Sequence, residues 1–227
     1  MEKALFEKYK IEIDDKKMLL FNNYYHDLVK KNKVMNLTAI TEKEQVYLKH
    51  FIDSVLPIKN IKKNSRVLDI GTGAGFPGIP LKIVEDSLEI VLLDSLNKRI
   101  EFLKEEIANL GLSNISAIHS RAEDYANVSR ETFDYVVSRA VAKLNTLLEY
   151  CLPFVKVGGT FIAYKSINME DEINESKNAL NVLGGKIEKI EKLDLEGNLR
   201  TLIYIKKVRE SPKKYPRGQN KPKNQPL

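Results

Sequence analysis

The sequence predicts an α/β fold with a mostly parallel, seven-stranded sheet that ends in an antiparallel hairpin. Three observations support this prediction. From Ser65 onward, short β-branched and aliphatic runs alternate with amphipathic segments of helical spacing. The first run enters a turn that holds four glycines within positions 71–78. The last two runs are joined only by Glu196-Gly197-Asn198, which suits a hairpin and is too short for a crossover helix.

The elements of this fold can be placed by residue number. We expect strands at 66–70, 88–94, 115–119, 133–138, 160–165, 186–195 and 199–207. We expect crossover helices at 78–84, 97–110, 146–155 and 169–183. Pro77 and Pro80 are compatible with a helix start at this point, because the first-turn N–H groups of a helix have no intrahelical partner.

The chain divides into three segments. Residues 1–60 carry apolar side chains at helical spacing and form an N-terminal helical extension. Residues 61–208 form the α/β domain. Residues 209–227 are basic and hold four of the eight prolines, and they lack the apolar surface to fold alone, so we expect a tail that is disordered or ordered only by a ligand.

The net charge of +6 is concentrated at the C-terminus. Eight Lys or Arg residues oppose one Glu between residues 206 and 227, so the rest of the chain is close to neutral. A single cysteine, Cys151, excludes an intrachain disulfide and a multi-cysteine metal cluster. No apolar run approaches the roughly 18 residues of a membrane span. We expect a soluble, cytoplasmic protein without a metal site.

The glycine-rich turn indicates a nucleotide-type cofactor site, because a ligand can approach a main chain without side chains and meet free N–H groups. Gly73, Gly75 and Gly78 satisfy the G-x-G-x-x-G pattern of dinucleotide sites, but that pattern alone is weak evidence. Gly71 already ends the strand. Counted from Gly71, the third glycine position holds Phe76, which suits an adenosine or a thioether better than a pyrophosphate.

Asp94 ends the second strand, 23 residues after Gly71. A carboxylate at this position binds ribose hydroxyls in NAD and in S-adenosylmethionine sites alike. The C-terminal hairpin favours S-adenosylmethionine, because a dinucleotide domain would continue with a sixth parallel strand. Glu123 and Asp124, after the third strand, suit a contact with the adenine edge or the ribose, or else a cap on the next segment.

Several separate blocks carry a family resemblance. They are Asn36-Leu37-Thr38, His50-Phe51-Ile52-Asp53-Ser54, Asp69 to Pro80, Leu93 to Arg99, and Ser138-Arg139-Ala140. In these blocks the chain resembles the S-adenosylmethionine-dependent methyltransferases known as glucose-inhibited division protein B, or ribosomal small-subunit methyltransferase G. The resemblance covers roughly residues 20–207.

The resemblance implies a Rossmann-like class I S-adenosylmethionine-dependent methyltransferase fold. It also implies methylation of guanine N7 in 16S ribosomal RNA near the decoding centre. The partner is then 16S ribosomal RNA or the small ribosomal subunit, and we expect a monomer. By position, the family's cofactor contacts fall on Gly71, Phe76, Ala122, Glu123 and Arg139, and the ribose argument adds Asp94. Arg139 also has a plainer interpretation, an ion pair with an acid.

The chemistry agrees with this interpretation. Guanine N7 has a lone pair and no proton, so we expect positioning without a general base and assign no catalytic residue. Val137-Ser138-Arg139-Ala140 stands where amino methyltransferases carry an Asn/Asp-Pro-Pro-aromatic clamp, which argues against exocyclic-amine chemistry. His50 and Cys151 lie among apolar residues, and we expect both to be structural.

Lys98, Arg99, Lys165, Lys213 and Lys214 are candidate RNA contacts. The tail lysines would bind phosphates without choosing the base. The alternatives are a solvated helix face for Lys98 and Arg99, and a solubilising terminus for the tail. Two other functions also stay open at this point, an NAD-dependent oxidoreductase and a non-catalytic RNA-binding module.

Overall fold

The computed structural model describes residues 2–139, 142–166 and 169–227, and within them seven strands form one sheet. Its order is β3-β2-β1-β4-β5-β7-β6. The strands are β1 Arg66–Ile70, β2 Glu89–Asp94, β3 Ile115–His119, β4 Phe133–Ser138, β5 Val155–Lys165, β6 Gly185–Leu195 and β7 Asn198–Lys207. The first five pair in parallel, and β7 runs antiparallel between β5 and β6. The predicted α/β fold and its closing hairpin are confirmed.

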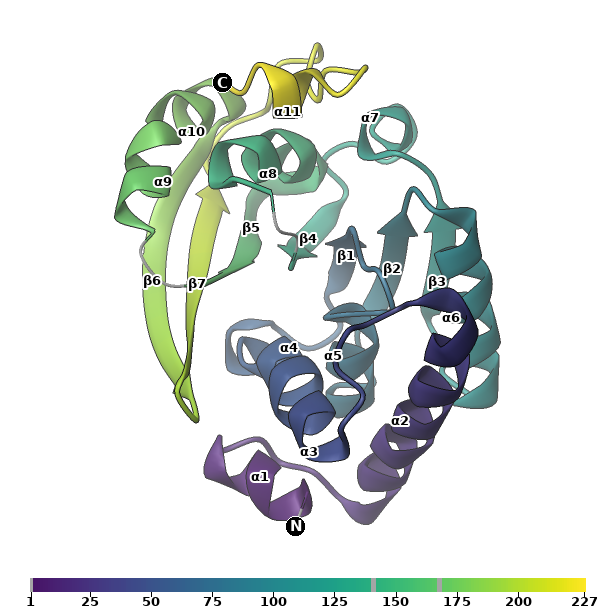
Figure 1. The fold of residues 1–227 in the computed structure, drawn as a ribbon. Helices are drawn as coiled ribbons and strands as arrows, with labels where there is room; N and C mark the ends of the chain where they lie inside the picture. The colour runs from purple at the N-terminus through teal and green to yellow at the C-terminus, as the bar shows by residue number, and fades with distance from the viewer. Residues whose placement is uncertain (1, 140–141, 167–168) are drawn as a thin grey trace.

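Both faces of the sheet are buried at its central strands β1, β2 and β4, which explains why these strands are almost wholly apolar. Alternate residues of a strand point to opposite faces, so Val67 belongs to one hydrophobic cluster and Leu68 to the other. Figure 1 shows the N-terminal helices on one side of the sheet and the helices of the C-terminal half on the other.

The N-terminal residues form a helical layer over the first face. Its elements, with the crossover helices of the same face, are α1 Glu2–Lys8, α2 Asp15–Met35, α3 Lys43–Val46, α4 Asp53–Val55, α5 Gly78–Val84 and α6 Asn97–Asn109. One π-helical turn, Tyr47–Ile52, links α3 to α4. Phe21, Tyr24 and Phe51 are fully buried in the same cluster as Leu92 of β2. The extension therefore shares its core with the sheet.

The second face is covered by α7 Ala122–Tyr125, α8 Leu144–Cys151, α9 Glu170–Glu175 and α10 Lys177–Leu183. Two helices are shorter than predicted. The helix expected at 146–155 ends at Cys151, because Pro153 has no N–H for the helix, and β5 begins at Val155. The helix expected at 169–183 is divided at Ser176, whose hydroxyl donates to the Glu172 carbonyl at 2.6 Å.

The C-terminal segment differs from the predicted disordered tail. Residues 209–227 cross α8 and include a short helix, α11 Lys221–Asn224, as the yellow end of the ribbon in Figure 1 shows. Tyr215 is buried in the hydrophobic cluster that contains Leu68, called the second cluster below, and Arg217 forms an ion pair with the buried Glu149. The sequence prediction counted only apolar residues within the tail, whereas the tail is held by a hydrophobic surface and an acid that α8 supplies.

Candidate active site

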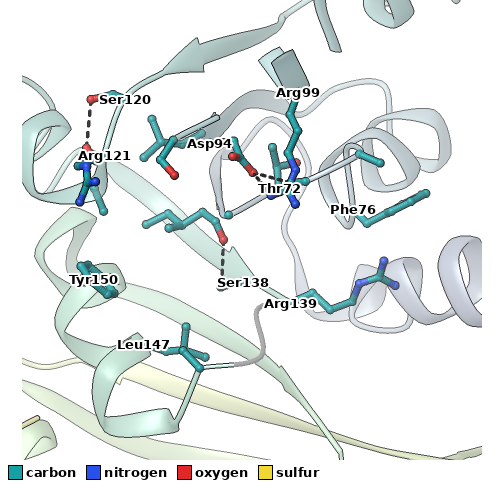
Figure 2. Close-up of a pocket in the computed structure, with 18 of the residues that line it drawn as sticks. Thr72, Phe76, Asp94, Arg99, Ser120, Arg121, Ser138, Arg139, Leu147 and Tyr150 are labelled. Atoms are coloured by element: carbon teal, nitrogen blue, oxygen red, sulfur yellow. Dashed lines mark hydrogen bonds and ion pairs between the residues drawn. The ribbon is translucent and has the colours of Figure 1, made fainter. Parts of the chain in front are cut away.

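A cavity of about 710 Å³ opens at the carboxyl ends of β1, β2, β3 and β4. Ligands of open α/β sheets bind at this edge, and the volume is within the range of small-molecule sites. In Figure 2, Phe76 and Arg139 lie at one end of the cavity, Arg121 and Tyr150 at the other, and Asp94 between them. All six predicted cofactor contacts line it: Gly71, Phe76, Asp94, Ala122, Glu123 and Arg139.

The glycine turn serves both the cavity and the core. Gly71 and Gly73 have positive φ angles of 72° and 60° and line the cavity. A Cβ on Gly73 would meet no atom within 4 Å, whereas one on Gly75 would lie 2.7 Å from the Tyr24 hydroxyl. A Cβ on Gly78 would lie 2.2 Å from Leu92. Gly75 and Gly78 are therefore required by packing, and neither lines the cavity.

Asp69 holds this turn from inside the protein. Its Oδ2 accepts hydrogen bonds from the Thr72 hydroxyl at 2.7 Å and from the Gly78 N–H at 2.8 Å. Burial raises the pKa of the Asp69 carboxyl to about 7, although both hydrogen bonds favour the carboxylate. Asp69 does not line the cavity, so its role is to position the turn.

Asp94 carries the carboxylate at the centre of the cavity. Its Oδ2 accepts from the Gly73 N–H at 3.0 Å and from Arg99 Nη1 at 3.2 Å, and its Oδ1 accepts from the Leu96 N–H at 2.9 Å. These bonds fix the carboxylate between β1 and β2. The Asp94 side chain is 3% exposed. Its hydrogen bond from the Gly73 N–H links the end of β2 to the turn after β1, two positions that the sequence related only by their spacing of 23 residues from Gly71 to Asp94.

The segment after β3 forms the wall beyond Asp94. Ala122 and Glu123 open the short helix α7 there, and both line the cavity. The Glu123 side chain is 11% exposed and lies 3.7 Å from Arg121 Nη1. Carboxylate and main-chain groups at this place suit the polar edge of a purine base, since an adenine presents both donors and acceptors.

Phe76 lies in an aromatic stack at the opposite end of the cavity. Its ring stacks on His50 at 4.7 Å between centroids, and the Arg139 guanidinium lies 5.0 Å from the ring centre. Burial, followed by the charge of Arg139, lowers the pKa of His50 to about 3, so the imidazole is neutral near pH 7. The Thr38 hydroxyl lies 2.8 Å from its Nε2.

A second cavity, of about 390 Å³, lies on the other side of His50 and Arg139 and shares both residues with the first. At its base the buried Asp53 accepts hydrogen bonds from Arg139 Nη1 and from Arg200 Nε, both at 3.0 Å. Arg139 is therefore paired with an acid, as its plainer interpretation held, and it also forms the partition between the two cavities.

The five candidate RNA contacts are not gathered in one place. Arg99 lines the first cavity and donates to Asp94, and Lys98 is exposed beside it. The Lys165 side chain is only 7% exposed and lies 2.8 Å from Glu172, so its charge is already matched. Lys213 and Lys214 are exposed on the C-terminal segment. Ala140 of the Ser138-Arg139-Ala140 block lies outside the described residues.

Three residues around the site were missed by sequence reasoning. Tyr24 donates its hydroxyl to the Ala74 carbonyl of the glycine turn at 2.5 Å, Asp53 anchors Arg139, and Asn220 lines the first cavity. Asp53 lay inside a block that carried the family resemblance, which was a usable signal. Tyr24 and Asn220 reach the site only through tertiary packing.

Comparison with known proteins identifies close relatives. The family model described as rRNA small subunit methyltransferase G (GidB) matches residues 17–202. Two curated proteins named ribosomal RNA small subunit methyltransferase G align over nearly their whole length. The protein from Lachnoclostridium phytofermentans is 54% identical, covering 91% of this chain and 88% of its own. The protein from Lactobacillus helveticus is 48% identical, covering 100% and 98%.

The fold is also shared with more distant solved structures. The crystal structure of M. jannaschii TYW2 in complex with AdoMet superposes with a TM-score of 0.55. The match covers 69% of this chain and 77% of that one, at 19% sequence identity. At this identity the likeness concerns the fold alone.

Proposed function

The chain belongs to the rRNA small subunit methyltransferase G family, and we propose that its reaction takes place where the two cavities meet, at Arg139 and His50. The protein is an S-adenosylmethionine-dependent methyltransferase of 16S ribosomal RNA, and the transfer is to guanine N7. The observation that carries the site assignment is the arrangement along the first cavity, where glycine main chain, the Asp94 carboxylate and the Glu123 wall follow one another.

These residues fit the cofactor in that order. Asp94 binds the ribose hydroxyls with the acceptor capacity that Gly73, Leu96 and Arg99 leave free. Ala122 and Glu123 then meet the adenine, and the methionine end extends along Gly71 towards Phe76 and Arg139. When bound, S-adenosylmethionine would supply a methyl group on a sulfonium; the N7 lone pair would form the new N–C bond as the C–S bond breaks, and the thioether S-adenosylhomocysteine would leave.

The protein's contribution to this displacement is position. The acceptor nitrogen carries no proton, so no side chain has to remove one, and the neutral His50 is not needed as a base. We place the acceptor guanine in the second cavity, because it adjoins the methionine end of the first. Arg200 and Lys49 line this cavity and offer cations to the RNA backbone.

The finer features of the partner are proposals as well. The substrate is 16S ribosomal RNA, alone or within the small subunit, and the site lies near the decoding centre. In the described residues no helix is long and apolar enough to cross a membrane. We expect action in the cytoplasm as a monomer. The exposed Lys213 and Lys214 add phosphate contacts that strengthen binding without selecting the base.

Calorimetry and a methylation assay on two variants test this division of roles. Asp94→Ala should weaken S-adenosylhomocysteine binding about 10- to 100-fold, because a charged hydrogen-bond acceptor is removed. Asp124→Ala, an exposed acid of α7 outside the cavity, is the matched control and should bind normally. Arg200→Gln should raise KM for 16S ribosomal RNA and leave cofactor affinity unchanged.

Opposite results would contradict the proposal. Full cofactor affinity in Asp94→Ala would remove Asp94 from the site. Loss of cofactor affinity in Arg200→Gln, with normal KM for RNA, would place the acceptor elsewhere. NADH binding without S-adenosylhomocysteine binding would support the oxidoreductase alternative, and binding of neither would support a non-catalytic RNA-binding module.

A further inference from the structure

The C-terminal segment, residues 209–227, reaches the wall of the first cavity. Asn220 belongs to this segment and lines that cavity together with Arg121, Ala122, Glu123 and Tyr150. Arg121 Nη1 lies 3.4 Å from the Asn220 side-chain oxygen. A segment at the far end of the sequence thus completes the end of the cavity that Figure 2 shows at Arg121 and Tyr150.

A buried ion pair holds the segment in place. Glu149 of α8 has a side chain with 0% exposure, and Arg217 donates to it from its main-chain N–H, its Nε and its Nη2 at 2.7–2.8 Å. In the described part of the chain, these are the hydrogen bonds that Glu149 accepts. A buried carboxylate is costly without such partners. The pair therefore specifies where the segment lies, and Pro222 adds a carbonyl that accepts from Thr146 at 3.1 Å.

A second set of contacts fixes the start of the segment. Arg130 donates to the carbonyls of Ser211, Pro212 and Tyr215 at 2.6–3.0 Å. The buried Lys207 donates to the Ser211 hydroxyl at 2.5 Å. With both sides of Asn220 attached to the domain, its side chain is held at the cavity while remaining exposed to a ligand.

We propose that Asn220 is a cofactor-binding residue that contacts the adenine ring, and that the Glu149–Arg217 pair positions it. This inference rests on the proposed cofactor site. The order of the strand ends supports it, because β1, β2 and β3 lie side by side and the ribose belongs to Asp94 at the end of β2. The base must then extend past β3, to the wall that Asn220 completes. An Asn side chain offers one acceptor and one donor, which matches the N6 and ring-nitrogen edge of adenine.

The test compares affinities for two ligands by calorimetry. Asn220→Ala should bind S-adenosylhomocysteine about 3- to 10-fold more weakly, the range of one or two exposed hydrogen bonds. It should bind S-inosylhomocysteine, which lacks the adenine amino group, almost as wild type does, so the preference between the two ligands shrinks. Asn224→Ala, in the same segment but outside the cavity, is the matched control.

A positioning role for Arg217 gives a separate result. Arg217→Gln should weaken S-adenosylhomocysteine binding, and the double variant with Asn220→Ala should bind no more weakly than the weaker of the two single variants. Unchanged affinity in Asn220→Ala, or an equal loss for both ligands, would overturn the proposal. Asp94→Ala separates this from failure of the cofactor site itself, because that variant loses affinity whether or not Asn220 contacts the base.

Discussion

Tyr24 connects the N-terminal helices to the glycine turn, and removing its hydroxyl tests how much that connection contributes. The side chain is fully buried, and its hydroxyl donates to the Ala74 carbonyl at 2.5 Å. In Tyr24→Phe this buried carbonyl loses its side-chain donor. An unpaired buried acceptor costs about 1–3 kcal/mol of the free energy of unfolding. We also expect S-adenosylhomocysteine binding to weaken several-fold, because Gly73 and Ala74 line the cavity.

Tyr25 provides the matched control on the next position of α2. Its hydroxyl donates to the Thr41 carbonyl at 3.2 Å in an exposed place, so water can replace it. Tyr25→Phe should change the free energy of unfolding by less than about 0.5 kcal/mol. Urea unfolding measures both variants, with equal m values as the condition for comparison. Equal losses in Tyr24→Phe and Tyr25→Phe would refute the proposed support of the turn.

Two further predictions concern charge. Glu106 is buried in α6, and burial together with Asp27 and Glu105 raises the pKa of its carboxyl to about 8. The folded state then holds a proton that the unfolded state releases near pH 4.5, so stability should fall as pH rises from about 4.5 to 8. Glu106→Gln should raise the free energy of unfolding by about 1–3 kcal/mol at pH 8.5 and by little at pH 5. In urea unfolding, the control Glu101→Gln, an exposed acid of the same helix that is not among the charges acting on Glu106, should show no such difference. The double variant Lys213→Gln/Lys214→Gln should make the slope of log RNA affinity against log salt shallower by about 1–2, and an unchanged slope would contradict the phosphate contacts.

The test of the lysines uses substitution because the tail is part of the folded structure. Deleting residues 209–227 would remove Tyr215 from the second cluster and leave Glu149 buried without Arg217. Weaker RNA binding after such a deletion could then arise from damage to α8. Neutralising two exposed side chains leaves the Glu149–Arg217 pair intact; besides the charge, it removes the contact of Lys214 Nζ with the Tyr215 ring, 5.2 Å from the ring centre.

Local sequence patterns were sufficient for most of the sheet. The bounds of β1, β3 and β4 agree with the prediction to the residue. The sequence patterns that predict a strand, a helix or a glycine turn each span only a few neighbouring positions, so these bounds could be found from local sequence. The helix breaks at Pro153 and Ser176 were not predicted. Both depend on where the next strand or turn begins, which the helical pattern itself does not contain.

The six predicted cofactor contacts line one cavity, but the residues that hold them in place were not predicted. Each missed contact joins residues far apart in the sequence: Arg139 and Asp53 are 86 positions apart, and Arg200 and Asp53 are 147 apart. The glycines show the same limit. Nothing local distinguishes Gly73, which faces the cavity, from Gly78, whose missing Cβ makes room for Leu92 of the next strand. Glycine count therefore indicates a close approach without saying whether a ligand or the core makes it.

The N-terminal segment lines both cavities as well as extending the domain. His50, from the π-helical turn, stacks on Phe76, and Asp53 holds the guanidinium that separates the two cavities. The carbonyl of Lys49 accepts a further hydrogen bond from Arg139 at 3.1 Å. In the proposed arrangement, a Rossmann-like sheet alone supplies the cofactor edge but leaves the acceptor side of Arg139 open. Residues 2–60 would close that side, so the proposed partition between donor and acceptor depends on a segment that contributes no strand to the sheet.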